Sequence, residues 1–166
     1  LELKKTFSEL QMITGQKKGL GDAYKRGFQY ALEQMDPEVI FQMDADGQHD
    51  PSLIPEFLKL IEQGNDLVIG SRFVEGGSTP DFSFRRKLIS RVGNLLVRYV
   101  GGARHVQDCT SGYRAIRASF LKESDLSFLS TKGYSFQSSL LCELIWRDAK
   151  AVETPIIFTP RIGGDS

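Results

Sequence analysis

The sequence predicts an α/β fold built on a parallel sheet. Residues 39–43 and 66–70 are short apolar runs, which is the pattern of buried strands. Residues 52–63, between them, carry apolar side chains at helical spacing. A strand, a helix and a strand joined by short connections indicate a right-handed crossover with parallel pairing. A third apolar run at 152–158 supplies a further strand, and 166 residues are enough for one domain with a sizeable core.

Apolar residues at helical spacing predict four further helices, which cover residues 1–13, 23–34, 84–100 and 135–148. The loop before the second of them contains Lys17 and Lys18. Basic residues beside a helix N-terminus can bind an anion, but a solvated loop explains the same residues equally well. Both interpretations of this loop stay open.

Composition excludes several classes of protein. Lysine plus arginine and aspartate plus glutamate both number 21, so no overall charge favours binding to nucleic acid. Cys109 and Cys142 form neither a disulfide framework nor a metal-binding pattern, which is typical of a reduced, cytoplasmic protein. No apolar run approaches the length of about 18 residues that a membrane span needs.

Two carboxylates follow the strand predicted at 39–43. Asp44 and Asp46 are two residues apart, so in extended backbone both point to one side while Ala45 points to the other. Carboxylate oxygens suit Mg²⁺ and Mn²⁺, and Mg²⁺ usually binds one or two carboxylates together with water and substrate phosphates. The pair therefore indicates a divalent cation site whose partner is a diphosphate.

The same stretch has two alternative interpretations. A helix-loop-helix calcium loop needs glycine and glutamate at the places where this chain has His49 and Pro55, so we exclude it. Asp46 or Asp50 could instead cap the helix that begins near Ser52. This capping role stays open as an alternative to metal binding.

Basic residues gather after the second predicted strand. Arg72 follows it directly, and the carboxyl ends of parallel strands share one edge of a sheet. We therefore expect Arg72 near the carboxylates, where a phosphate needs countercharge. No acidic residue stands between Asp81 and Asp108, and that excess of cations suits an anionic ligand or a membrane surface. The helix at 84–100 carries Arg85, Arg86, Lys87, Arg91 and Arg98.

An ordered series of motifs covers the chain from about residue 17 to its last residue. The motifs occupy residues 18–24, 43–51, 70–73, 86–91, 108–114, 133–137 and 161–166. Their order and spacing together resemble the dolichol-phosphate (polyprenol-phosphate) mannosyltransferases, which are inverting family-2 glycosyltransferases with the GT-A fold. The resemblance implies a Rossmann-like nucleotide-diphospho-sugar transferase sheet with helices on both faces. The family's amino-terminal strands have no counterpart, so it also implies that residues 1–166 are a partial GT-A catalytic domain, truncated at the amino end and at the carboxyl end.

The resemblance implies residue roles as well. Asp44, Asp46 and Gln48 would hold the Mg²⁺ or Mn²⁺ that bridges the diphosphate of a nucleotide-sugar donor. Asp46, Arg72 and Arg86 would form the catalytic set, with both arginines contacting phosphate, including that of the acceptor lipid. Gln137 would lie near the sugar and Arg161 over the donor. The full substrate-binding set would be Arg91, Asp108, Thr110, Ser111, Arg114, Gln137 and Arg161.

The implied activity is inverting transfer of a hexose, above all mannose from GDP-mannose, to a polyprenyl or dolichyl phosphate at the cytosolic membrane face. A phosphate monoester has its second pKa near ~6, so at neutral pH it needs little help from a general base. We accordingly interpret His49 and His105 as structural, with His49 close enough to the carboxylates to support them. Two alternatives remain open: a related transferase that uses a UDP-sugar or another acceptor, and an inactive nucleotide-sugar-binding fragment.

Overall fold

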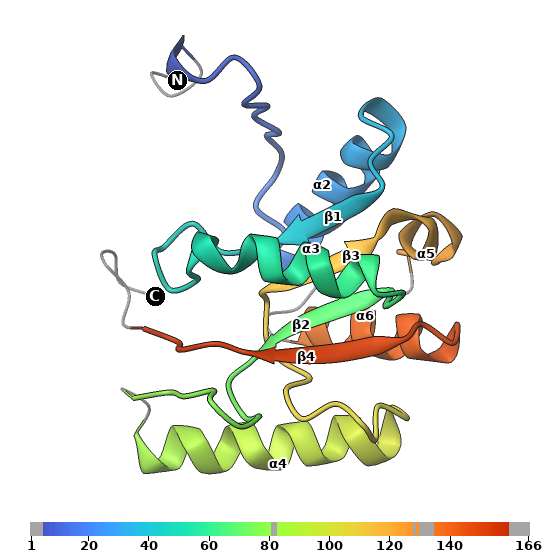
Figure 1. The fold of residues 1–166 in the computed structure, drawn as a ribbon. Coiled ribbons are helices and arrows are strands. Elements are labelled where there is room, and N and C mark those ends of the chain that lie inside the picture. Colours follow the sequence, from blue (N-terminus) through green and yellow to red (C-terminus); the bar gives the residue numbers. More distant parts are fainter. Residues whose placement is uncertain (1–4, 81–82, 128, 130–134, 160–166) are drawn as a thin grey trace.

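The computed structural model describes residues 5–80, 83–127, 129 and 135–159, and within these ranges it contains one open four-stranded sheet (Figure 1). The strands are β1 (Val39–Gln42), β2 (Leu67–Ser71), β3 (Arg114–Arg117) and β4 (Ala151–Pro155), and their order across the sheet is β1-β3-β2-β4. β2 and β4 pair in parallel, whereas β3 is antiparallel to both of its neighbours.

The predicted parallel pairing of β1 with β2 is wrong. β3 lies between them, with Phe41 and Val68 both opposite Ala115. Because β1 and β2 are each antiparallel to β3, they still run in the same direction and end at the same edge of the sheet. The carboxyl ends of β1 and β2 therefore share one edge of the sheet, as expected, although the two strands do not pair.

The helices are α2 (Leu20–Gln34), α3 (Ile54–Glu62), α4 (Phe84–Val100), α5 (Ala118–Glu123) and α6 (Ser135–Trp146), with a 3₁₀ turn, η1 (Pro51–Leu53), before α3. The predictions for α2, α3, α4 and α6 are confirmed, whereas α5 and strand β3 were not predicted. The predicted helix over 1–13 is wrong beyond Thr6, because residues 7–19 are not helical. Its apolar residues Phe7, Leu10 and Ile13 are exposed, and without a surface to pack on, a short amphipathic helix is marginal.

The core has two parts, one on each face of the sheet. Leu67 and Ile69 of β2 pack with Phe28 of α2 and Leu140 of α6, whereas Val68 packs with Phe57 of α3. This alternation is the two-residue period of a strand buried on both faces. The expected helices on both faces are confirmed, with α3 in front of the sheet and α6 behind it in Figure 1.

Helix α4 lies apart, along the bottom of the view in Figure 1. Seven of its apolar side chains are more than half exposed, from 51% for Val92 to 82% for Val100. We call this set the apolar surface of α4: Leu88, Ile89, Val92, Leu95, Leu96, Tyr99 and Val100. No helix in the described part of the chain is both long enough and apolar enough to cross a membrane.

Candidate active site

The carboxylate loop, residues 43–50, leaves the end of β1 and carries Asp44 and Asp46. The Asp44 side chain accepts a hydrogen bond at Oδ1 from the Tyr24 hydroxyl, at 3.1 Å. Asp46 Oδ1 accepts from the main-chain amide of Gln48 at 3.1 Å. Gly47 has a φ of 80°, a left-handed conformation that glycine adopts without strain. Both carboxylates are thus held in a tight turn at the carboxyl edge of the sheet.

His49 anchors this loop to the protein core. Its Nδ1 accepts a hydrogen bond from the Asp44 amide at 2.9 Å, and its buried ring stacks on Tyr113 with centroids 4.9 Å apart. Burial lowers the pKa of His49 below its usual value, against the opposing charges of Asp44 and Asp46. A neutral ring is what an accepting Nδ1 requires. The structural interpretation of His49 is therefore confirmed.

Asp50 performs the capping role that the sequence left open. Its side chain accepts a hydrogen bond from the Ser52 amide at 2.9 Å at the start of η1. Its main-chain carbonyl accepts a second bond from the Tyr113 hydroxyl at 2.8 Å. Because Asp50 caps the helical segment, Asp44 and Asp46 are not needed for that purpose.

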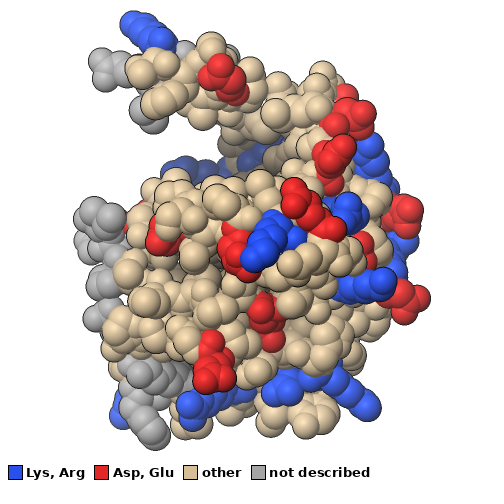
Figure 2. Space-filling view, in the orientation of Figure 1, with Lys and Arg blue, Asp and Glu red and all other residues tan. Residues whose placement is uncertain are grey.

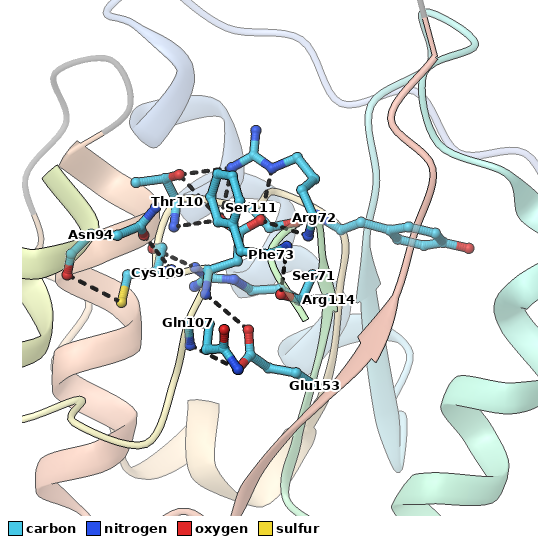
Figure 3. Close-up of polar contacts among 12 residues, drawn as sticks. Ser71, Arg72, Phe73, Asn94, Gln107, Cys109, Thr110, Ser111, Arg114 and Glu153 are labelled. Atoms are coloured by element: carbon cyan, nitrogen blue, oxygen red, sulfur yellow. Dashed lines mark hydrogen bonds and ion pairs between the residues drawn. The ribbon is translucent and has the colours of Figure 1, made fainter. Parts of the chain in front are cut away.

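Arg72 forms a largely buried ion pair with Asp108, and Figure 3 shows the Arg72 guanidinium directed toward Thr110. The guanidinium donates from Nε to Oδ2 and from Nη2 to Oδ1, both at 2.7 Å, and Nη2 also donates to Thr110 Oγ1 at 2.8 Å. The guanidinium carbon lies 5.4 Å from the ring centroids of Phe73 and Phe158. Such a two-point contact fixes the plane of an arginine as well as its charge.

The loop that carries Asp108 is held in place by side chains of β4 and α4. The main-chain amides of Gln107 and Asp108 donate to the carboxylate of Glu153 on β4, at 2.7 and 2.8 Å. The amide of the next residue, Cys109, donates to Asn94 Oδ1 of α4 at 2.7 Å. The loop before β3 therefore ties α4 and β4 to the position of Arg72.

Besides the buried Asp108, three predicted substrate-binding residues lie beneath the site instead of on its surface. Arg114 is fully buried and donates to the carbonyls of Gln137 and Cys109 at 2.8 and 3.0 Å, and burial lowers its pKa to about 10. Gln137 and Ser111 are also buried, and Ser111 Oγ accepts from the Tyr113 amide at 3.3 Å. These contacts support the floor of the site, and direct contact of the three with substrate stays a prediction.

A cleft of about 610 Å³ opens between the end of β2 and helix α4. Arg72 and Arg91 line it with Leu95, which also belongs to the apolar surface of α4. The full lining is Arg72, Phe73, Gly77, Ser78, Thr79, Arg91, Asn94, Leu95, Arg98 and Gln107. The cleft therefore joins a basic wall to an exposed apolar helix face. The Arg86 side chain and the whole of Arg161 fall outside the described residues.

The residues present suit a hard divalent cation that a substrate helps to hold. No group of three or more His, Cys, Asp or Glu side chains arranged for a metal occurs in the described ranges. Two carboxylates are nevertheless the complement that Mg²⁺ commonly takes from a protein when phosphate oxygens complete its coordination. An amide binds a cation through its oxygen, and the Nε2 of Gln48 donates to the Thr159 carbonyl at 2.9 Å.

Comparison with known proteins identifies the family of this chain. Residues 2–124 match the profile of Glycosyl transferase family 2. The chain belongs to this family. As a family-2 chain it is 41% identical over 145 residues to polyprenol monophosphomannose synthase of Mycolicibacterium smegmatis, covering 87% of this chain and 54% of that protein. It is 41% identical over 150 residues to undecaprenyl-phosphate mannosyltransferase of Micrococcus luteus, covering 90% of this chain and 60% of that protein.

A third relative of this family-2 chain is dolichol-phosphate mannosyltransferase of Pyrococcus furiosus, 35% identical over 154 residues that cover 90% of this chain and 40% of that protein. The chain thus spans between 40% and 60% of the length of these relatives. A crystal structure of glucosyl-3-phosphoglycerate synthase from Mycobacterium tuberculosis, in complex with Mn²⁺, UDP-glucose and glycerol 3-phosphate, superposes with a TM-score of 0.61. That match is 17% identical and covers 98% of this chain and 52% of the other. It supports the GT-A fold.

Two residues of the candidate site were not predicted from the sequence. Tyr24 received no role of its own within the predicted helix at 23–34, yet its hydroxyl contacts Asp44. Glu153 lies in β4 and offered no motif, yet its carboxylate holds the loop that carries Asp108. The one available signal was the place of Tyr24 within the motif at 18–24.

Proposed function

We propose that this protein transfers mannose from GDP-mannose to the phosphate of a polyprenyl phosphate, with inversion and with the help of Mg²⁺ or Mn²⁺. The observation that carries the proposal is the shared sheet edge. The carboxylates of Asp44 and Asp46 and the basic cleft beside Arg72 meet there, and the cleft opens on the apolar surface of α4. The names of the three curated relatives support the choice of sugar and acceptor.

Asp44 and Asp46 serve the donor side in this proposal. Both carboxylates lie close enough to Tyr24 and to His49 to affect the pKa of each, so they occupy one small region. These two carboxylates would hold a divalent cation, which when bound would supply positive charge against the diphosphate of the leaving nucleotide. The protein's own task is to keep two carboxylates fixed at the strand end before the donor binds, which the turn at Gly47 and the His49 anchor achieve.

Arg72 and Arg91 serve the acceptor side. A phosphate monoester is mostly ionised at neutral pH, so it needs positioning and countercharge more than a proton acceptor. Arg72 is suited to this task because Asp108, Phe73 and Phe158 fix its guanidinium. The acceptor phosphate enters the cleft between Arg72 and Arg91, in line with the sugar carbon that it attacks.

The apolar surface of α4 faces the membrane in this proposal. A helix with exposed apolar residues on one side and basic residues beside them is typical of a helix that lies in a membrane interface. Figure 2 shows lysine and arginine side chains along the lower edge of the molecule, over α4. Leu95 belongs both to this surface and to the cleft, so a prenyl chain in the membrane can deliver its phosphate to Arg91 and Arg72.

Replacing Asp46 with alanine in the full-length protein tests the proposal. We expect loss of metal-dependent mannose transfer, measured as labelled mannose recovered in the lipid extract. Asp125→Ala is the matched control, because Asp125 is exposed and follows β3 and α5 at the opposite edge of the sheet. Retained transfer by the Asp46 variant contradicts the proposal. A panel of GDP- and UDP-sugars gives the donor, and transfer from a UDP-sugar alone would contradict the assignment to GDP-mannose.

A further inference from the structure

The Tyr24 hydroxyl connects helix α2 to the carboxylate loop across twenty residues of sequence. It donates to Asp44 Oδ1 at 3.1 Å, and the contact is partly buried. Gly112, two residues before β3, lies near the other oxygen of this carboxylate, because a Cβ added to that glycine would stand 3.9 Å from Asp44 Oδ2. The two oxygens of Asp44 therefore have different surroundings: Oδ1 meets the phenol and Oδ2 is turned toward the Gly112 backbone.

The core, and not the loop, determines the place of the Tyr24 ring. The ring stacks parallel to Phe136 of α6, with centroids 5.5 Å apart and an interplanar angle of 1°. It also stacks on Phe28, one turn along α2, with centroids 6.1 Å apart. Because Phe28 and Phe136 are both buried, the hydroxyl is presented from a rigid surface. The loop has to adapt to the tyrosine.

Asp44 is consequently held at two points. Its main-chain amide donates to His49 Nδ1 at 2.9 Å, which fixes its backbone, and Tyr24 holds one carboxylate oxygen. A carboxylate oxygen can only accept, so the Tyr24 hydroxyl is the donor in this contact. A carboxylate fixed in this way loses little rotational freedom when a cation binds.

We infer that Tyr24 is a positioning residue for the cation, which holds Asp44 by Oδ1 so that Oδ2 serves as the metal ligand. The inference rests on the proposed function, in which Asp44 binds Mg²⁺ or Mn²⁺. Tyr24 does not touch the reacting atoms. It acts by giving the Asp44 carboxylate one orientation before the metal and the diphosphate arrive.

Tyr24→Phe in the full-length protein tests the inference, because it removes the hydroxyl and retains the ring that stacks on Phe136. We expect Mn²⁺ to bind about tenfold more weakly, the range in which loss of a group supporting a metal ligand usually falls. The measurement is the electron paramagnetic resonance signal of free Mn²⁺ during a titration in the presence of GDP. Tyr30→Phe makes the same chemical change farther along α2 and should bind Mn²⁺ like the unmodified protein.

Equal Mn²⁺ affinity of the Tyr24 variant and the unmodified protein would overturn the inference and leave the proposed function intact. Absence of saturable Mn²⁺ binding in the unmodified protein would overturn the metal site of the proposed function and the inference with it. A second readout is the metal dependence of transfer. We expect Tyr24→Phe to need about tenfold more Mn²⁺ for half its maximal rate and to recover that rate at saturation. A rate lowered equally at every Mn²⁺ concentration indicates a merely structural role and contradicts the inference.

Discussion

Arg72 donates two hydrogen bonds to Asp108, Nε to Oδ2 and Nη2 to Oδ1, each at 2.7 Å. The Asp108 side chain is fully buried and that of Arg72 is 10% exposed, so water screens the pair little. The pair joins the end of β2 to the loop before β3. The proposed acceptor side of the site therefore depends on a contact between two residues that are 36 positions apart in the sequence.

Removing the carboxylate of Asp108 should destabilise the fold. Asp108→Ala removes the fully buried carboxylate that accepts two hydrogen bonds from Arg72, and breaking a buried ion pair in this way costs about 3–5 kcal/mol. Urea unfolding followed by circular dichroism measures the change. Asp125→Ala, an exposed position, should change the free energy of unfolding by no more than about 0.5 kcal/mol. Similar small changes in both variants would contradict a structural role for the pair.

Arg72→Lys should weaken use of the acceptor more than use of the donor. Lysine keeps the charge but cannot make the two-point contact that orients the guanidinium. We expect kcat/KM for polyprenyl phosphate to fall by about 30-fold, equivalent to about 2 kcal/mol. Steady-state kinetics with each substrate varied in turn gives the result. An equal loss for GDP-mannose and the acceptor would argue against the acceptor assignment.

The apolar surface of α4 predicts attachment to lipid vesicles. Ile89 is 73% exposed, and burying such a side chain in a membrane interface contributes about 1.5–3 kcal/mol. Ile89→Glu should therefore reduce partitioning onto anionic vesicles by about tenfold or more. Flotation with vesicles measures this.

Met35→Glu is the matched control for the vesicle experiment, because Met35 is 60% exposed but follows α2 at the opposite edge of the sheet. Its partitioning should match that of the unmodified protein. Equal loss in both variants would show that added negative charge, and not the surface of α4, decides attachment.

Cys109 should resist alkylation in the folded protein. Burial raises the pKa of its thiol to about 12, with Arg114 opposing the shift, so the thiolate is scarce at pH 8. Because the unfolded thiol ionises near its ordinary pKa, this group favours the folded state less as pH rises above about 8.5 toward 12. Mass spectrometry of a Cys142→Ser variant treated with iodoacetamide measures the reaction. Rapid labelling at pH 8 without urea would contradict the burial of Cys109.

The sequence predicted those parts of the fold that local patterns determine. Helix α4 and strand β2 follow from the spacing of their own apolar residues. β3 was missed because Arg114 and Arg117 stand at its ends, and only the folded protein supplies carbonyl partners for the buried Arg114. The helix over 1–13 was predicted wrongly because spacing alone cannot reveal whether a packing surface exists.

The candidate site was predictable in its residue types and less so in its contacts. Asp44, Asp46 and Arg72 stand at strand ends, so topology brings them to one edge even though β1 and β2 do not pair. The contact between Tyr24 and Asp44 was not predictable, because it depends on how α2 packs against α6. Periodicity identifies a buried face but does not identify which polar atom on that face meets a partner.

Metal-dependent formation of mannosyl lipid is the direct test of the proposed mannose transfer. The measurement is transfer of labelled mannose from GDP-mannose to polyprenyl phosphate by the full-length protein, first with Mn²⁺, then with excess EDTA, and finally with Mn²⁺ restored. We expect a labelled lipid product that EDTA abolishes and Mn²⁺ restores. A product that forms equally well in EDTA, or no product with GDP-mannose under any of these conditions, would contradict the proposal.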